Sequence, residues 1–259
     1  MDASFALEGR RLEAAWFGPP PAAAPTLVLL HEGLGCLSLW RGLPEQLARE
    51  MGCGVLAYSR FGYGGSASVT LPRPLDYMHE EARTLGRVLD HFGVADALLV
   101  GHSDGASIAA IGAGAALDAR LRGLVLLAPH FFVEPCCIAA IEAAVRAFET
   151  GDLRAKLARW HGANTEAAFR GWAGAWLDPG FPQAFHLGAE IAAIRAPMLI
   201  VQGDVDPYGT MAQAAFCLRE AAGSVDVLAL SGCGHAPQVD MPEATRRAII
   251  DFARRVLAG

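Results

Sequence analysis

Six short apolar runs alternate along the chain with longer segments of helical periodicity. A strand that is covered on both faces is apolar throughout, and two parallel strands need a crossover connection, usually a helix, between them. The runs lie at 26–31, 54–59, 97–102, 124–129, 198–203 and 225–230, and the helical segments at 37–50, 76–92, 104–117, 209–221 and 242–257. This alternation predicts an α/β fold, with a mostly parallel central sheet and helices on both of its faces.

Two segments depart from the alternation. The opening residues 5–18 predict an antiparallel hairpin at the sheet edge, followed by a stiff proline-rich linker at 19–25. The gap between Pro129 and Met198 is much longer than one crossover helix needs and is helical in pattern. We therefore expect a single core domain, formed by residues 1–130 and 191–259, with a helical cap inserted at 131–190 (the cap segment).

Aromatic residues gather in the second half of the cap segment. Trp172, Trp176, Phe181 and Phe185 fall within fourteen positions of one another. Such a cluster could belong to an ordinary helical core. In a cap over the sheet, however, it is better interpreted as the roof of an apolar pocket. Trp172 and Trp176 are therefore predicted substrate contacts.

Composition excludes several kinds of partner. The formal net charge is -6 and no polybasic run occurs, so a nucleic-acid partner is not expected. The N-terminal residues contain acids and arginines where a signal peptide is apolar, and no stretch is long enough to span a bilayer. The expected location is cytoplasmic, without membrane association. The 6 cysteines lack the paired spacing of metal ligands, so we expect reduced thiols and no metal.

A serine lies between two glycines where the third apolar run meets a helical segment. Residues 101–105 read GHSDG, which fits the pattern G-x-S-x-G of a sharp strand-to-helix turn. Glycines at 101 and 105 allow neighbouring backbone to approach closely, so that Ser103 projects at the N-terminus of a helix. This context predicts a nucleophile. Asp104 directly after it is unexpected, because a carboxylate beside a nucleophilic serine opposes an anionic intermediate.

A serine nucleophile needs a base, and the base needs a carboxylate that orients it. His235 lies in a glycine-containing loop after the run 225–230, and Asp204 and Asp206 follow the run 198–203. Asp206 is preferred, because the chain has by then left the strand and can approach His235; Asp204 is the alternative. The resulting order of serine, aspartate and histidine is the one that strand-to-helix nucleophile turns of this kind use.

Five segments together resemble the α/β-hydrolase superfamily over essentially the whole chain, in particular small capped serine esterases and carbon–carbon bond hydrolases. They read LLHEGLG, YSRFGYGGS, GHSDG, GDVDPYG and GCGHAP. The resemblance implies the α/β-hydrolase fold with an inserted cap and a triad of Ser103, His235 and Asp206. The sequence departs from the pattern at Glu32, where a small residue is common, and at Asp104, where an apolar or amide side chain is usual.

The resemblance also implies an oxyanion hole made by backbone amides of Asp104 and of Gly33 or Leu34. Asp104 would then contribute its N–H, while its carboxylate turns away within the first helical turn, where the helix dipole favours an anion. A carboxylate in that place needs a cationic partner, and Arg60 is the expected one.

Two other polar residues near these segments, Glu32 and His130, have two interpretations each. Glu32 either anchors neighbouring side chains or binds a polar group of the substrate. His130 faces the cap segment, where it packs or touches substrate. We expect His102 to point into the structure and His31 to brace the loop that follows it.

These features predict a hydrolase of a small acyl substrate, namely a carboxylic ester, thioester or lactone, that works through an acyl-enzyme without a cofactor. The alternative activity is hydrolysis of a carbon–carbon bond in a diketone-like ring-cleavage product. A non-catalytic ligand-binding module is a third hypothesis, since fold does not dictate function. The expected partner is the small-molecule substrate, and the apolar cap surface permits a homodimer.

Overall fold

A seven-stranded sheet forms the centre of the computed structural model, which describes residues 1–115 and 118–257. Its strands run in the order β3 (Ala14–Phe17), β5 (Gly54–Tyr58), β4 (Thr26–Leu30), β6 (Ala97–His102), β7 (Leu121–Leu127), β8 (Met198–Gly203) and β9 (Val225–Leu230). All neighbours are parallel except β3, which pairs antiparallel with β5. The predicted α/β class and mostly parallel sheet are confirmed.

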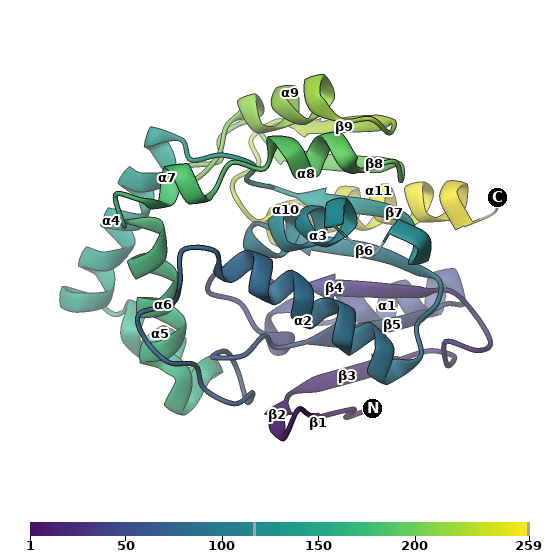
Figure 1. The fold of residues 1–259 in the computed structure, drawn as a ribbon, viewed down its shortest axis with the longest axis horizontal. Helices are drawn as coiled ribbons and strands as arrows, with labels where there is room; N and C mark the ends of the chain where they lie inside the picture. The colour runs from purple at the N-terminus through teal and green to yellow at the C-terminus, as the bar shows by residue number, and fades with distance from the viewer. Residues whose placement is uncertain (116–117, 258–259) are drawn as a thin grey trace.

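Helices cover both faces of this sheet (Figure 1). One face carries α2 (Tyr77–Phe92), α3 (Asp104–Ala115) and α8 (Gly188–Ala193), with α9 (Met211–Glu220) beside α8; the other carries α1 (Leu43–Met51) and α11 (Pro242–Leu257). Alternate residues of β4 serve the two layers: Val28 and Leu30 pack in one apolar cluster, Leu27 and Leu29 in the other. A strand whose side chains are needed on both faces must be apolar throughout, as the sequence is.

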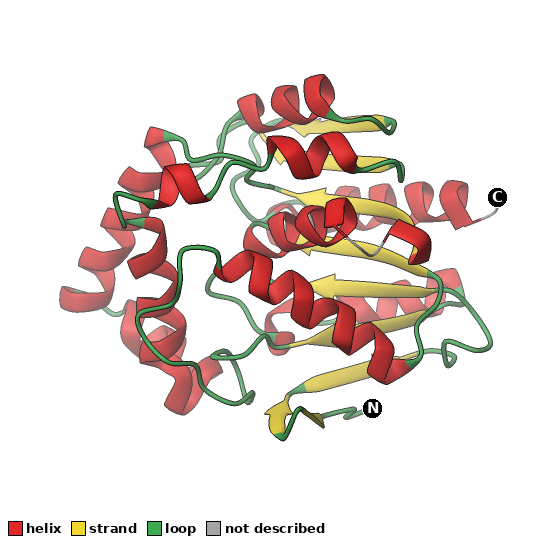
Figure 2. Ribbon diagram, viewed as in Figure 1, coloured by secondary structure: helices red, strands yellow, loops and turns green. Residues whose placement is uncertain are grey.

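From α4 (Pro135–Thr150) to α7 (Phe181–Ala184), the chain between β7 and β8 lies beyond the carboxyl ends of the strands, whereas α8 packs on a face of the sheet (Figure 2). Between α4 and α7 lie α5 (Leu153–His161), a 3₁₀ turn at Gly162–Asn164 and α6 (Thr165–Trp176). The aromatic cluster of the cap segment is buried here, and Trp176 contacts both Phe181 and Phe185. The exact limits of the cap stay a prediction, and residue 190 falls inside α8, which packs on α3.

Two expected helices need correction or completion. The helix expected at 37–50 is interrupted: a 3₁₀ turn at Leu37–Trp40 ends at Arg41, whose φ is 51°, and α1 begins afterwards with Pro44 in its first turn. Proline has no N–H to donate, so it suits the start of a helix and not its interior. The end expected at 117 for the helix after Ser103 lies outside the described residues.

The opening hairpin is present, but it does not join the main sheet. Strands β1 (Phe5–Leu7) and β2 (Arg10–Leu12) form a separate two-stranded sheet, and β3 is the edge strand of the central one. The remaining short elements are a 3₁₀ turn at Asp118–Arg120 and the four-residue helix α10 (Pro237–Asp240). None of the described helices has both the length and the apolar character needed to cross a bilayer.

Candidate active site

Ser103 occupies the turn between β6 and α3 in a conformation that few residues other than glycine adopt. Its φ is 52°, and β6 ends immediately before it while α3 begins immediately after it. A Cβ atom at Gly105 would collide with the carbonyl oxygen of Leu30, and one at Gly101 with the backbone of Gly105 and Ala106. The two glycines therefore allow a turn that holds Ser103 in a strained conformation, which is typical of functional sites.

Ser103, His235 and Asp206 form one hydrogen-bonded chain. The Oγ of Ser103 lies 2.9 Å from Nε2 of His235, and Nδ1 of His235 lies 2.8 Å from Oδ2 of Asp206 and 2.9 Å from Oδ1. Asp204 does not reach His235; its carboxylate instead accepts hydrogen bonds from Ser231 Oγ and the N–H of Gly232. The geometry thus distinguishes the two aspartates that the sequence leaves open.

Asp206 is held in the ionised state by its surroundings. Burial alone would raise the pKa of this carboxyl, but hydrogen bonds from His235, from the N–H of Tyr208 and from Gln202 outweigh it and lower the pKa. Because the carboxylate accepts from several donors at once, it stays fixed opposite Nδ1 of His235. The imidazole is thereby oriented with Nε2 toward Ser103.

His102 points away from Ser103 into the structure, as expected, and supports the loop that carries His235. Its Nε2 lies 2.7 Å from the carbonyl oxygen of His235, and its Nδ1 lies 3.3 Å from Oε2 of Glu32 and 2.9 Å from the amide of Gln238. Burial opposes the charge of His102, but the hydrogen bond and charge of Glu32 raise its pKa above the usual value. For Glu32, burial is again the largest influence, yet His102 lowers the pKa of this carboxyl to about 2.

His31 braces the loop of Gly33 and Leu34. Its Nδ1 lies 2.7 Å from the carbonyl oxygen of Glu32, and its Nε2 accepts from the N–H of Arg60 at 3.0 Å. Burial and the charge of Arg60 hold the pKa of His31 well below its usual range, so the ring is neutral, with the hydrogen on Nδ1. The loop it supports lines the cavity in front of Ser103.

Three residues that line the same cavity have a backbone N–H without an acceptor among the described residues. Gly33 and Leu34 donate no hydrogen bond there, and Asp104, as the first residue of α3, has no partner for its N–H within the helix. They include the amides that the resemblance to the superfamily implies, namely that of Asp104 and that of Gly33 or Leu34. Free donors beside a serine hydroxyl are suited to an oxygen that becomes negatively charged.

The carboxylate of Asp104 is buried in a polar cluster with Arg60. Arg60 Nη2 lies 3.7 Å from Oδ2 of Asp104, the same oxygen accepts from the hydroxyl of Tyr77 at 2.7 Å, and Tyr77 in turn accepts from Nε1 of Trp176 at 3.1 Å. Burial raises the pKa of Asp104, although Arg60 and Tyr77 act in the opposite direction. The expected cationic partner is therefore in place.

A cavity of about 100 Å³ lies against Ser103 and His235. Its walls include all four residues predicted to contact substrate: Glu32, His130, Trp172 and Trp176. The indole of Trp172 lies so close to Gly33 that a Cβ atom there would collide with it. The cap segment thus closes directly over the loop of Gly33 and Leu34 (the loop of free amides). Its helix α4 adds Cys137 and Ile141 to the cavity wall.

One contact to that loop has no counterpart in the sequence analysis. His161, at the end of α5, lies with Nε2 3.0 Å from the carbonyl oxygen of Leu34, while its Nδ1 accepts from the N–H of Gly64 at 3.0 Å. It connects the cap segment to the loop of free amides. No local pattern marks it, because its role depends on how the cap segment packs.

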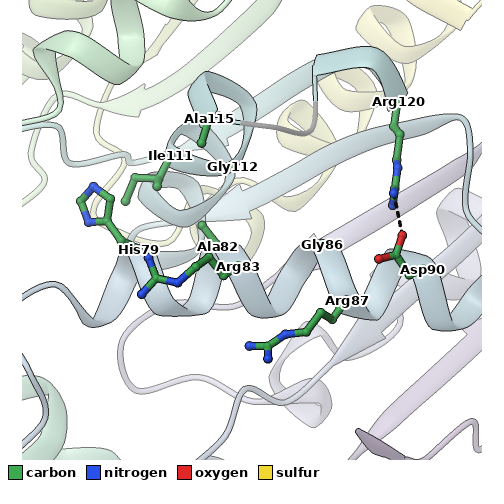
Figure 3. Close-up of a pocket in the computed structure, with 10 residues that line it drawn as sticks. All are labelled: His79, Ala82, Arg83, Gly86, Arg87, Asp90, Ile111, Gly112, Ala115 and Arg120. Carbon is green, nitrogen blue, oxygen red and sulfur yellow. Dashed lines mark ion pairs between the residues drawn. The ribbon is translucent and has the colours of Figure 1, made fainter. Parts of the chain in front are cut away.

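A second hollow, of about 590 Å³, lies between α2 and α3 and shares no lining residue with the first (Figure 3). Its polar walls include Arg83, Arg87 and Arg120. Arg120 pairs with Asp90 at 2.6 Å, and Arg87 pairs with Glu8 at 2.6 Å. None of these three arginines lines the cavity at Ser103.

The sheet order, the strained serine between strand and helix, and the chain of Ser103, His235 and Asp206 define the class of α/β-hydrolase folds. A model of the alpha/beta hydrolase family matches residues 27–248, and the protein belongs to this family. The family assignment supports a hydrolase. Curated proteins gave no significant match to the sequence.

Solved structures share the fold over nearly the whole chain. A hydrolase from Pseudomonas aeruginosa PA01 is 23% identical, with 97% of each chain covered and a TM-score of 0.74. The enol-lactonase from Burkholderia xenovorans LB400 is 21% identical over 96% of this chain and 98% of its own, with a TM-score of 0.75. The 2-hydroxy-6-oxo-6-phenylhexa-2,4-dienoate hydrolase of Rhodococcus sp. strain RHA1 is 15% identical, with 98% of each chain covered and a TM-score of 0.77. At these identities the likeness is one of fold.

Proposed function

We propose that the protein is a serine hydrolase that cleaves a small carboxylic ester, thioester or lactone through an acyl-enzyme. The observation that carries this proposal is the 2.9 Å contact between Ser103 Oγ and His235 Nε2, with Asp206 bonded to the other ring nitrogen. A nucleophile, its base and the group that orients the base are the parts that acyl transfer requires.

The proposed reaction uses only side chains, amides and water. Ser103 attacks the substrate carbonyl while His235 takes the hydroxyl proton, and Asp206 stabilises the imidazolium. The tetrahedral oxyanion accepts hydrogen bonds from the N–H of Asp104 and from that of Gly33 or Leu34. His235 then protonates the leaving group, and a water activated by the same histidine releases the acid from Ser103.

The size of the cavity supports a small acyl group. Cavities that enclose drug-sized ligands commonly measure about 300–1,000 Å³, whereas this one has about 100 Å³. Trp172 and Trp176 limit it on the side of the cap segment. A short acyl chain fits such a space, with the leaving group directed toward its mouth.

Hydrolysis of a carbon–carbon bond in a diketone-like compound is the competing activity. Its substrate would carry a carboxylate, which calls for a cationic group in the cavity. Among the described residues, no lysine or arginine lines the cavity, whereas two acidic residues, Glu32 and Asp104, line it. This charge distribution favours an uncharged ester, thioester or lactone.

Hydrolysis of p-nitrophenyl acetate and butyrate tests the proposal. We expect the wild type to hydrolyse at least one of these esters and Ser103→Ala or His235→Ala to lose at least about 10³-fold in kcat. Ser38→Ala, which removes an exposed serine hydroxyl, is the matched control and should keep the wild-type rate. Equal rates for Ser103→Ala and the wild type would refute the assignment of the nucleophile.

A further inference from the structure

The loop of free amides has little stiffness of its own. Gly33 has to be a glycine, because a Cβ atom there would collide with the indole of Trp172, and a Cβ atom at Gly35 would collide with the carboxylate of Glu32. Glycines on both sides leave the backbone around Leu34 many conformations. An amide that binds a developing oxyanion must be held in place before the reaction, so this loop depends on bonds from outside it.

The core of the protein holds the first peptide unit of the loop. The carbonyl oxygen of Glu32 and the N–H of Gly33 belong to the same planar unit. This oxygen accepts from Nδ1 of His31 at 2.7 Å, from Nη2 of Arg60 at 2.9 Å and from the N–H of Gly35 at 3.1 Å. Three donors on one carbonyl group fix the plane that carries the N–H of Gly33.

The cap segment holds the third peptide unit. The carbonyl oxygen of Leu34 accepts from Nε2 of His161 at 3.0 Å, and no other described residue donates to it. The same unit contains the N–H of Gly35, which is bound to Glu32. The cap thus fixes this unit at its oxygen and the core fixes it at its nitrogen. The unit that carries the N–H of Leu34 lies between the two fixed units.

His161 is set up as the donor in this contact. Its Nδ1 accepts from the N–H of Gly64 at 3.0 Å, so in a neutral ring the hydrogen is on Nε2, which faces Leu34. The residue is buried, and burial, the largest influence, lowers the pKa of the ring, which keeps it neutral. Both ring nitrogens therefore have a partner in the core, although His161 itself belongs to the cap segment.

We propose that His161 is a positioning residue for the hydrolysis at Ser103, and that its bond to Leu34 sets the loop of free amides for the oxyanion only while the cap segment is docked on the core. This inference rests on the serine-hydrolase function proposed above and adds a dependence on the cap. The bond acts on groups that stabilise the transition state more than the bound ester. Its loss should therefore lower kcat and leave KM little changed.

Two variants of His161 separate its two hydrogen bonds. His161→Asn keeps an acceptor for the N–H of Gly64 but has no donor in the place of Nε2, whereas the longer side chain in His161→Gln supplies a donor there. With p-nitrophenyl butyrate we expect His161→Asn to lose about 10- to 100-fold in kcat with little change in KM, and His161→Gln to recover most of the loss. Each variant is assayed well below its own Tm. If His161→Asn does not fold, His161→Leu tests the same loss.

Asn164 provides a matched control in the same corner of the cap segment. Its Nδ2 donates to the carbonyl oxygens of Gly64 at 3.1 Å and Ser66 at 2.7 Å, and it does not bond to Leu34. Asn164→Ala therefore weakens the attachment of the cap without removing the bond to the loop of free amides. We expect it to lower the Tm while its kcat stays within a few-fold of the wild type. His186→Gln, at an exposed histidine of the cap segment, should change neither quantity.

An inhibitor that forms an oxyanion without a leaving group gives a second readout. In propyl trifluoromethyl ketone, Oγ of Ser103 bonds to the carbonyl carbon, the carbonyl oxygen becomes the oxyanion, and the hydroxyl proton goes to Nε2 of His235. We expect the Ki of this ketone to rise in His161→Asn by about the factor by which kcat/KM falls. A purely structural role of His161 would not link the two quantities.

The outcomes that overturn the inference differ from those that overturn the proposed function. A wild-type kcat in folded His161→Asn or His161→Leu would refute the positioning role and leave the serine hydrolase intact. So would an equal loss of kcat in Asn164→Ala, a loss in His161→Gln as large as in His161→Asn, or an unchanged Ki of the ketone. A folded wild type that neither hydrolyses the ester nor binds the ketone would refute the proposed function together with the inference.

Discussion

Arg60 and Asp104 form an ion pair in the interior, with Nη2 and Oδ2 3.7 Å apart and essentially no exposure of either side chain. The pair explains how an acid can directly follow the proposed nucleophile. The carboxylate is bound to Arg60 and to Tyr77, while the backbone N–H of the same residue, the first of α3, has no acceptor within the helix. Residue 104 thus has separate uses for its side chain and its backbone.

Removal of Arg60 should destabilise the protein strongly. Arg60→Met leaves Asp104 as an unpaired buried charge, and breaking a buried pair in this way typically costs about 3–5 kcal/mol of unfolding free energy. Urea denaturation at neutral pH measures the loss. The double variant Arg60→Met with Asp104→Leu should recover part of it, because no charge is then left unpaired. Equal stability of Arg60→Met and the wild type would show that the pair contributes nothing.

Asp206 and Asp204 should differ sharply in their effect on activity. Asp206→Asn removes the carboxylate that orients His235, and we expect kcat to fall by about 10⁴-fold. Asp204→Asn touches only the loop of Ser231 and Gly232, so its kcat should stay within a few-fold of the wild type. Steady-state kinetics on one chromogenic ester decide between the two. A larger loss in Asp204→Asn would mean that the loop rearranges to use Asp204 as the acid.

Substitution of two glycines by alanine should change the stability of the protein in opposite directions. An alanine at Gly105 places a Cβ atom against the carbonyl of Leu30, and the overpacked turn should lose at least about 3 kcal/mol of stability. Gly174 is exposed in the last turn of α6, with nothing within 4 Å of a Cβ atom. Gly174→Ala should therefore gain about 0.5 kcal/mol, because alanine has the higher helix propensity and restricts the unfolded chain. Chemical denaturation of the two variants measures both effects, and a tolerated Gly105→Ala would argue against a tight turn.

The contact of Glu32 with His102 should give the stability a pH dependence. The folded-state pKa of His102 is raised, so this contribution is complete below its ordinary pKa of 6.5 and is lost as the pH rises through the folded value. The pKa of Glu32 is lowered from 4.5 to about 2, so its contribution is complete above 4.5 and is lost as the pH falls toward 2.

The difference in Tm between the wild type and Glu32→Gln should consequently be largest at about pH 5.5 and smaller at about pH 9 and about pH 3. Thermal unfolding at these three pH values measures it. Gln46→Glu, on the distant helix α1, is a control for the general effect of one charge. A difference in Tm that does not change with pH would show that His102 is not charged in the folded protein.

The architecture could be predicted because parallel strands impose a pattern on the sequence. Six apolar runs became β4 to β9, and the carboxyl ends of parallel strands meet at one edge, which is why Ser103, Asp206 and His235 could be expected to meet. The interruption at Arg41 was not foreseen, because the residues on both sides of it have helical periodicity. The six-residue helix α8 is too short for periodicity to reveal.

The contacts that complete the site depend on packing between distant segments. Asp104 meets Tyr77, 27 positions away, and Trp176, which bonds to Tyr77, comes from the cap segment. His161 reaches Leu34 across 127 positions. Arg60 could be proposed because it directly follows β5, which only β4 separates from β6, the strand that precedes Ser103. Residues that follow strands so close together in the sheet lie near one another. Side chains of the cap segment have no such constraint.

The most direct test of the proposed nucleophile is the intact mass of the protein after treatment with a serine-directed fluorophosphonate. The wild type should gain a single adduct, mapped to Ser103 by peptide sequencing, while Ser103→Ala should gain none and His235→Ala should react far more slowly. An adduct on another serine, or no adduct on a folded wild type that hydrolyses esters, would contradict the assignment of Ser103 as the activated nucleophile.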